Sequence, residues 1–253
     1  MSAAKKLLLV LLAATNLTAL ANDGAPILPY RPSATAPAQL PEPGQLEFEI
    51  GTLSAKSDDQ RRGSFPYQLK LALSPEWGVL LGGEAYVSSR EGGSRATGMG
   101  DTAITLKRAF QMTETSAFGL ELTSKIPTAK NTIGSGKADT MLNGIFSKDI
   151  DKVHIDLNLN ATRIGVLNRG EGKTQTGLST AVSMVLNDQW GVLGELAGTR
   201  RTGVANTAIF MTALTYSPSK RVTFDVGVAK GLNDASPDWA VFAGVVLPVT
   251  KFW

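Results

Sequence analysis

What this 253-residue sequence lacks narrows what the protein can be. It has no cysteine, which excludes disulfide bonds and thiolate metal sites. It has a single histidine, which is too few for an ordinary transition-metal centre. After residue 21 no apolar run approaches the roughly 20 residues that a membrane-spanning helix needs. Basic and acidic residues nearly balance, at 25 against 22, so charge does not indicate a nucleic-acid partner.

The first 21 residues have the pattern of a secretory signal peptide. Lys5 and Lys6 form a positive start, residues 7–14 form a short apolar core, and residues 19–21 (Ala-Leu-Ala) form a small-x-small cleavage site. We expect this segment to be removed after export across the inner membrane. Removing the two lysines from the 25 basic residues leaves 23 against 22 acidic ones, so the mature chain is close to neutral.

Residues 22–43 are rich in proline and hold six of the twelve prolines in the chain. Proline lacks a backbone N–H and disrupts both helices and central strands. The composition therefore predicts a flexible, extended N-terminal leader. The sequence leaves open whether this leader lies in the periplasm or inside the rest of the protein.

From residue 44 onward apolar and polar residues alternate with a period of two, which is typical of strands with one apolar and one polar face. In VHIDLNLN (153–160), for example, Val, Ile and Leu alternate with His, Asp and Asn. Twelve such segments can be counted, over approximately 44–54, 66–74, 77–88, 100–111, 116–126, 138–148, 153–165, 174–186, 189–200, 206–216, 221–231 and 239–253. Many have the roughly 9–11 residues of a tilted membrane strand, more than the five or six of an ordinary strand.

The connections between these segments alternate between short and long. The short ones read SPEW, MTETS, KDIDK, NDQW and SPSK, whereas those between them read AKSDDQRRGSF, SREGGSRATGM, PTAKNTIGSGK, GVLNRGEGK, TRRTGVA and LNDASPD. Outer-membrane barrels have short periplasmic turns and longer extracellular loops. Residues 44–253 are therefore predicted to form an all-β, antiparallel, up-and-down transmembrane β-barrel of about 12 strands. A soluble periplasmic β-sandwich is the alternative fold.

Aromatic residues gather at the ends of the predicted strands, as expected for the two interfacial girdles of a membrane barrel. The predicted interface aromatics are Tyr67, Trp77, Phe110, Phe118, Phe146, Trp190, Tyr216, Trp239 and Trp253. A tryptophan as the last residue is unusual for a soluble domain. It resembles the C-terminal signal by which barrels are recognised for assembly, so we expect the outer-membrane assembly machinery to bind this strand.

The alternation also predicts which polar side chains point into the barrel. The candidate lumen-lining residues are Glu47, Glu49, Lys70, Glu84, Asp101, Lys107, Glu121, Lys125, Asp139, His154, Asp156, Asn158, Glu195 and Asp225. Acids outnumber bases among them, which favours a polar lumen that weakly prefers cations. The same charges could instead pair with one another and fill a narrow barrel.

Several short motifs match one known family. GMGDTAITLKRAF (98–110) contains Gly-x-Gly-Asp, and residues 124–162 contain Pro-Thr before a Gly-rich loop, then Ser-Lys-Asp before a His/Asn-rich strand; WGVL occurs at 77–80 and at 190–193. With these features, most of residues 45–253 resembles the outer-membrane family labelled for the MetA pathway of phenol degradation. The resemblance implies a barrel transporter or channel associated by name with aromatic catabolism. It carries over no catalytic or binding residue.

Enzymatic and metal-binding interpretations find little support in the sequence. His154 and Asp156 share a face, as in barrel proteases, but they begin a strand at the periplasmic end, whereas those proteases act at the extracellular rim. No His-x-Ser pair suggests a barrel phospholipase. Residues 57–59 (Ser-Asp-Asp) and 134–137 (Gly-Ser-Gly-Lys) are read as loop residues, because the second lacks the spacing of a phosphate loop. We expect no catalytic residue, no metal and no cofactor.

The sequence as a whole predicts a channel in the outer membrane of a Gram-negative bacterium. Small solutes, including hydrophobic or aromatic compounds, would move down their gradient through the lumen or a lateral opening. The alternatives are a closed structural, adhesive or sensing barrel and, third, a barrel enzyme. The expected partners are outer-membrane lipid, the assembly machinery and a small solute, with no nucleic acid.

Overall fold

The computed structural model describes residues 24–58 and 60–253, in which the regular secondary structure is β-strand throughout. The predicted signal peptide lies outside this part. Among these residues no helix is long and apolar enough to cross a membrane. The strands are β1 (Gln45–Lys56), β2 (Gln60–Ala72), β3 (Trp77–Glu91), β4 (Ser94–Gly98), β5 (Thr102–Thr113), β6 (Ser116–Ile126), β7 (Asp139–Ile150), β8 (Val153–Arg163), β9 (Thr174–Val185), β10 (Trp190–Arg201), β11 (Val204–Ser219), β12 (Val222–Gly231) and β13 (Trp239–Lys251).

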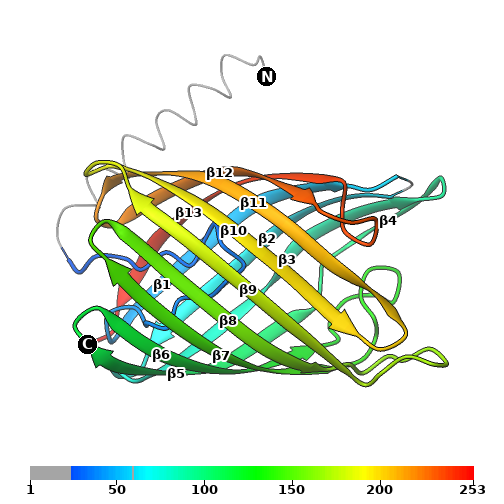
Figure 1. The fold of residues 1–253 in the computed structure, drawn as a ribbon, viewed down its shortest axis with the longest axis horizontal. Coiled ribbons are helices and arrows are strands. Elements are labelled where there is room, and N and C mark those ends of the chain that lie inside the picture. Colours follow the sequence, from blue (N-terminus) through cyan, green and yellow to red (C-terminus); the bar gives the residue numbers. More distant parts are fainter. Residues whose placement is uncertain (1–23, 59) are drawn as a thin grey trace, which may run out of the picture.

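The sheet closes on itself as an up-and-down barrel (Figure 1). Neighbouring strands pair antiparallel, and β1 pairs with β13 from Gln45–Lys251 to Lys56–Trp239. Closure leaves no sheet edge, which is what a bilayer requires of strands. β3 pairs with β4 toward its far end and with β5 at its near end, so β4 and β5 together occupy one place in the wall. The barrel therefore has the predicted twelve positions plus one extra strand.

Three connections predicted to be long are instead tight turns between strands that run further than expected. β1 and β2 pair as far as Lys56 and Arg61, only residues 92–93 join β3 to β4, and only residues 202–203 join β10 to β11. The longer loops are residues 127–138, 164–173 and 232–238. Alternation marks a strand only while one face is apolar, so it misses the polar strand ends beyond the membrane. The five short turns occur where the sequence predicts them.

The barrel is apolar outside and polar inside, the reverse of a soluble protein. On β8, Leu157 and Leu159 are 44% and 65% exposed, whereas Asp156 and Asn158 beside them are 7% and 3% exposed. Exposed large apolar side chains recur on β5 to β13. A contiguous apolar exterior of this kind is stable only against hydrocarbon. The fold is thus that of a transmembrane barrel.

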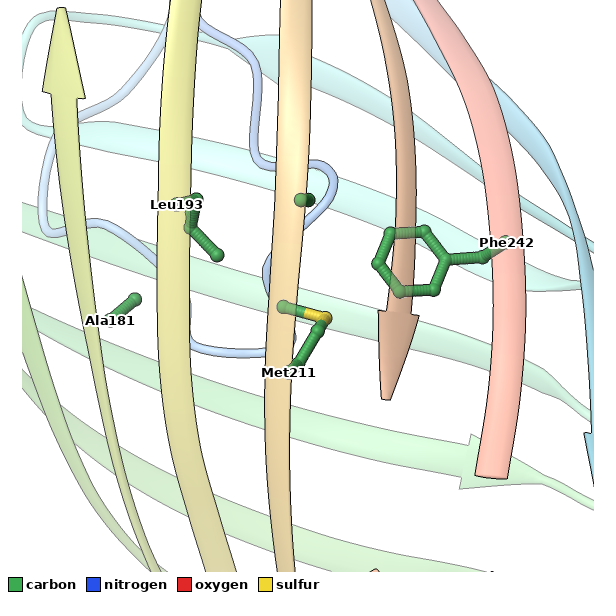
Figure 2. Close-up of a cluster of buried hydrophobic side chains, with 5 residues drawn as sticks. Ala181, Leu193, Met211 and Phe242 are labelled. Atoms are coloured by element: carbon green, nitrogen blue, oxygen red, sulfur yellow. The ribbon is translucent and has the colours of Figure 1, made fainter. Parts of the chain in front are cut away.

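The interior nevertheless carries two apolar clusters, and we call the larger one the inner apolar patch. It consists of the buried residues Ala181, Leu193, Met211, Ala213 and Phe242, packed against Leu53 and Ala229. Figure 2 shows the Phe242 ring reaching from β13 across β12 toward Met211. Gly227 of β12 makes room for this ring, because an added Cβ would lie 2.3 Å from its Cζ. The lumen is therefore less uniformly polar than the sequence predicts.

Candidate functional site: a leader bound inside the barrel

The leader, residues 24–43, lies inside the barrel, in the half near the short turns (Figure 1). It contains neither helix nor strand. Its contacts run in order around the wall: Leu28 meets β1, Arg31 meets β12, Thr35 meets β10, Ala36 meets β8 and Ala38 meets β7. The leader then passes β3, where Leu40 lies beside Gly78, and enters β1 at Gln45. This segment, whose position the sequence left open, therefore forms a loop across the lumen.

Inward carboxylates hold the leader by accepting its backbone N–H groups. Glu47 accepts from Leu28 at 3.1 Å, and Glu49 accepts from Tyr30 at 2.8 Å and from Arg31 at 3.1 Å. These bonds are needed because an irregular chain has no internal partners for its N–H groups. Hydrogen bonds to an ionised acceptor are also stronger than neutral ones. The inward acids thus accept the backbone hydrogen bonds that a helix or sheet would otherwise provide for this proline-rich segment.

The middle of the leader is held by Glu195 and by two neutral side chains. Glu195 accepts from the backbone N–H of Ala34 at 2.9 Å and of Thr35 at 3.1 Å, and from the Ser33 hydroxyl. Asn158 accepts from Ala36 at 3.0 Å, and Ser147 accepts from Ala38 at 2.8 Å. No lysine or arginine of the described residues forms a salt bridge with Glu195, so the leader itself supplies the donors that satisfy this buried carboxylate.

Arg31 adds a cation to the acidic wall. Its Nε and Nη2 donate to the two carboxylate oxygens of Asp225 at 3.0 and 2.9 Å, a bidentate arrangement. The guanidinium lies close to the backbone of Gly51 and Gly244. A Cβ on either glycine would lie within 2.6 Å of guanidinium atoms. The two glycines therefore make this close approach possible.

The Tyr30 ring lies in the lumen between two buried lysines. The Nζ atoms of Lys70 and Lys107 are 4.2 and 4.4 Å from the ring centroid, which is cation–π distance. Both lysines also donate to leader carbonyls, those of Leu28 and Pro37. The phenol donates to the Gln39 carbonyl at 2.7 Å. Burial raises the pKa of this phenol, and nearby carboxylates raise it further, so it stays a neutral donor.

The two lysines are themselves neutralised by the wall. Lys70 is fully buried, with Nζ 3.0 Å from Glu47 and 2.5 Å from Glu49. Lys107, also fully buried, is 3.1 Å from Glu121. Each buried lysine therefore has both an acidic partner and a leader contact.

Other predicted side chains belong to two clusters, of which, among the described residues, the one at the long-loop end forms no hydrogen bond with the leader and the one at the short-turn end contacts it through Ser147. At the long-loop end Glu84 pairs with Arg62, and Lys125 lies 3.5 Å from Asp101 and 2.8 Å from Asp139. At the short-turn end His154 lies between two acids, 2.6 Å from Asp149 and 3.1 Å from Asp156, and Ser147 donates to Asp156.

Sequence reasoning missed the residues that the leader contributes, above all Tyr30 and Arg31. The sequence does indicate the need for a cation such as Arg31, because the predicted inward acids outnumber the predicted inward bases and require a further positive charge to balance them. In the described part of the chain no three His, Cys, Asp or Glu side chains are grouped to hold a metal ion.

Cavities remain on both sides of the leader. One of about 620 Å³ lies between the leader and β8 to β12, and is lined by His154, Met184 and Leu193. Another, of about 230 Å³, lies against β2 and is lined by Pro66 and Gln68. Tyr30, Arg31 and Ser33 line both. These leader residues therefore form the partition between two spaces inside the barrel.

The fold is shared with solved outer-membrane proteins. An outer membrane channel from Pseudomonas putida F1 superposes with a TM-score of 0.67 at 14% identity, covering 84% of this chain and 98% of that one. The NanC porin gives a TM-score of 0.58 at 9% identity, covering 81% and 100%. The KdgM porin gives 0.54 at 9% identity, covering 80% and 99%. No curated protein matches the sequence.

The family comparison covers almost the whole described chain. Residues 30–248 match the family described as "Putative MetA-pathway of phenol degradation". The match begins at Tyr30, within the leader, and continues into β13. It agrees with the resemblance carried by the Gly-x-Gly-Asp, Pro-Thr and WGVL motifs. The chain therefore belongs to this family.

Proposed function

We propose that the protein is a channel of the Gram-negative outer membrane for passive uptake of small solutes, exported by residues 1–21 and gated by its leader. The single observation that carries the proposal is the leader looped across the lumen, with a cavity on each side. The inward charges predicted from the sequence are the proposed lining of the path. A solute crossing the barrel would have to pass Tyr30 and Arg31, so moving them opens the route.

The chemistry of the leader's contacts suits a movable gate. The leader is joined to the barrel at one end, at residue 44, and is otherwise held by hydrogen bonds, ring contacts, the apolar contacts of Ala38 and two ion pairs, Arg31–Asp225 and Glu42–Lys251. If it leaves, Lys70 keeps Glu47 and Glu49 as partners, and water can solvate the freed carboxylates. A charge buried without a partner would be strongly unfavourable. Opening therefore avoids this cost, because every charge keeps a partner or becomes hydrated.

The inner apolar patch supports small hydrophobic or aromatic compounds as the solutes. Leu193 belongs to that patch and also lines the 620 Å³ cavity, together with Ile27 and Pro29 of the leader. The cavity joins this apolar surface to the polar groups of His154, Asp156 and Thr223, and a concave site that combines apolar walls with placed polar groups is typical of small-molecule binding. The family's description, which names phenol degradation, supports the same class of solute.

The gate is tested by removing it. Single-channel conductance in planar bilayers is compared between the mature protein and a variant lacking residues 24–43. We expect several-fold larger conductance for the deletion, because the partition is gone. Heat-modifiable migration on an unboiled gel checks that both barrels are folded. A folded deletion variant with no conductance would contradict the channel and favour a closed structural barrel.

The solute class is tested with a pair of leucines on β10. Phenol is added while ion current is measured through the leader deletion, and we expect it to block current by occupying the apolar patch. Leu193→Ser on the inner face should weaken the block. Leu196→Ser on the lipid-facing side of the same strand is the matched control and should leave it unchanged. Equal block in all three proteins would show that the patch does not bind the solute.

We also propose that the C-terminal end of β13 is the address read by the assembly machinery. Phe252 donates its N–H to the Gly44 carbonyl at 2.9 Å, and Trp253 is 61% exposed at the short-turn rim. Deleting Trp253 should lower the amount of barrel inserted into the outer membrane without changing the conductance of the molecules that do insert. Normal insertion of the shortened chain would contradict this role.

A further inference from the structure

A row of basic side chains crosses the outer face of the barrel at the long-loop end. In the strand ladder Lys230 pairs with Trp239, Trp239 with Lys56, Lys56 with Arg61, Arg61 with Arg90, and Arg90 with Arg95. Directly opposed residues of an antiparallel sheet place their side chains on the same face. We call Lys56, Arg61, Arg90, Arg95 and Lys230 the basic row.

The basic row faces outward rather than into the lumen. On β1, Lys56 has the parity of the outward Phe48 and Ile50, and the opposite parity to Glu47, which binds the leader. Trp239, within the row, is 43% exposed. Arg61, Arg90, Arg95 and Lys230 are all exposed. The side chains are therefore available to a partner outside the barrel.

The row is unfavourable in the isolated barrel. Like charges directly opposite one another on a sheet repel and lower stability. Within residues 24–58 and 60–253, no acid forms a salt bridge with any member of the basic row. The nearby Glu91 has the parity of the other face, where Gln60 donates to it. An anionic partner would convert this repulsion into attraction.

The height of the row indicates where such a partner lies. Phe65 and Tyr86, whose ring centroids are 6.2 Å apart, are exposed aromatics on β2 and β3. Arg61 is four residues further along β2, or about 13 Å along the strand. For a strand tilted by roughly 40° that is about 10 Å along the membrane normal. Beyond Trp239 the row continues to Arg90 and Arg95 on the β3–β4 hairpin, which projects beyond the rim of the barrel (Figure 1).

We propose that the basic row binds the phosphate groups of the glycolipid in the outer leaflet, lipopolysaccharide. Three of its five members are arginines, whose planar guanidinium groups match phosphate oxygens with two parallel hydrogen bonds. The three arginines stand on directly paired strands, about 5 Å apart, so a headgroup carrying several phosphates can engage more than one of them. The interaction is independent of conduction and would fix the orientation of the barrel in the leaflet.

The test compares two triple variants that lose the same charge. R61Q/R90Q/R95Q removes the arginines of the row, and K137Q/R169Q/K173Q removes three exposed loop cations elsewhere on the long-loop end. Binding of fluorescent lipopolysaccharide is measured with full-length mature protein in neutral phosphatidylcholine vesicles. A surface cation contributes about a fivefold factor in binding to anionic lipid, so the row variant should bind roughly 100-fold more weakly. The loop variant should bind as the unmodified protein does.

Further arms distinguish the source of the phosphate. Dephosphorylated lipopolysaccharide should bind the unmodified protein as weakly as the row variant binds the intact lipid, and inorganic phosphate at equal concentration should not compete. The proposal is overturned if the row variant binds normally, if the loop variant loses as much, if the dephosphorylated lipid binds equally well or if inorganic phosphate displaces the lipid. Should the triple row variant fail to insert, R90Q alone, with an expected fivefold loss, takes its place.

Discussion

Two lysines on the inner wall have the same kind of partners and very different surroundings. Lys70, near the short turns, lies between Glu47 and Glu49, and Lys125, near the long loops, lies between Asp101 and Asp139. The Lys70 side chain is fully buried, whereas that of Lys125 is 28% exposed. Both stand on strands with the same alternation. The difference is the leader, which covers the first lysine and does not reach the second.

This comparison shows that the leader, rather than the wall, shields inward charges from water; we call the part of the lumen that it covers the dry half and the part at the long loops the wet half. A wet lumen screens its charges, so each pair there contributes little. A dry one makes every charge depend on its partners. Substitutions in the two halves should therefore have unequal effects, even where the residues exchanged are the same.

The largest effect is expected for Lys70→Met, which leaves Glu47 and Glu49 buried without their cation. Breaking a buried pair in this way costs about 3–5 kcal/mol. The protein can avoid that penalty by releasing the leader, which lets water reach the two acids. Tyr30 should then become a cleavage site for chymotrypsin in the folded barrel. The measurement is the rate of cleavage after Tyr30, with heat-modifiable migration confirming the barrel.

Lys125→Met is the matched substitution in the wet half. Its side chain is partly exposed, so its loss should cost at most about 1 kcal/mol and leave the leader protected. If both variants released the leader equally, or if neither did, the distinction between a dry and a wet half would be wrong.

These two lysines also show how far the sequence can predict the site. Alternation assigns Lys70 and Lys125 to the same face, because it records only which side of the sheet a residue occupies. It cannot tell how deeply the residue is buried, since that depends on a segment elsewhere in the chain. The barrel itself is predictable from period, strand length and turn spacing.

The leader's path could not be predicted for a related reason. Its prolines exclude helix and central strand, but they do not say what the remaining N–H groups bind. Their partners, such as Glu195 and Asn158, are well over one hundred residues away in sequence. The strands that continue past the membrane were missed because both their faces are polar, as at Arg90 and Arg95.

A smaller effect is expected for Glu195→Gln, which keeps the size of the side chain and removes its charge. The amide oxygen can still accept a hydrogen bond, but the charge-assisted bonds from the Ser33, Ala34 and Thr35 groups weaken. Leaving such a group poorly satisfied costs about 1–3 kcal/mol. We expect brief openings in single-channel recordings rather than full release.

Glu84→Gln is the corresponding change in the wet half, where the carboxylate pairs with Arg62 and does not bind the leader. It should leave the frequency of openings unchanged. Openings of equal frequency in both variants would mean that Glu195 does not hold the gate.

Two substitutions of Tyr30 separate the contributions of its ring and of its hydroxyl to holding the leader in place. Tyr30→Leu removes both cation–π contacts, each worth about 1–2 kcal/mol when desolvated. Tyr30→Phe keeps the ring between Lys70 and Lys107 and loses only the hydrogen bond to Gln39, worth about 1 kcal/mol. Proteolysis of the leader, with proteinase K in place of chymotrypsin, should be faster in the leucine variant than in the phenylalanine one. Equal rates would assign the effect to the hydroxyl alone.

The smallest effect is expected for Lys125→Glu, measured as the ratio of cation to anion permeability. In the mature protein the leader is the narrowest barrier, so a charge reversal in the wet half should change the ratio less than about twofold, given screening by salt. In the variant lacking residues 24–43 that barrier is absent and both halves are wet. The same reversal should then shift the ratio measurably toward cations, because Asp101 and Asp139 lose their counter-charge. A large shift with the leader present would place the selectivity filter at the long loops and would reverse the roles assigned to the two halves.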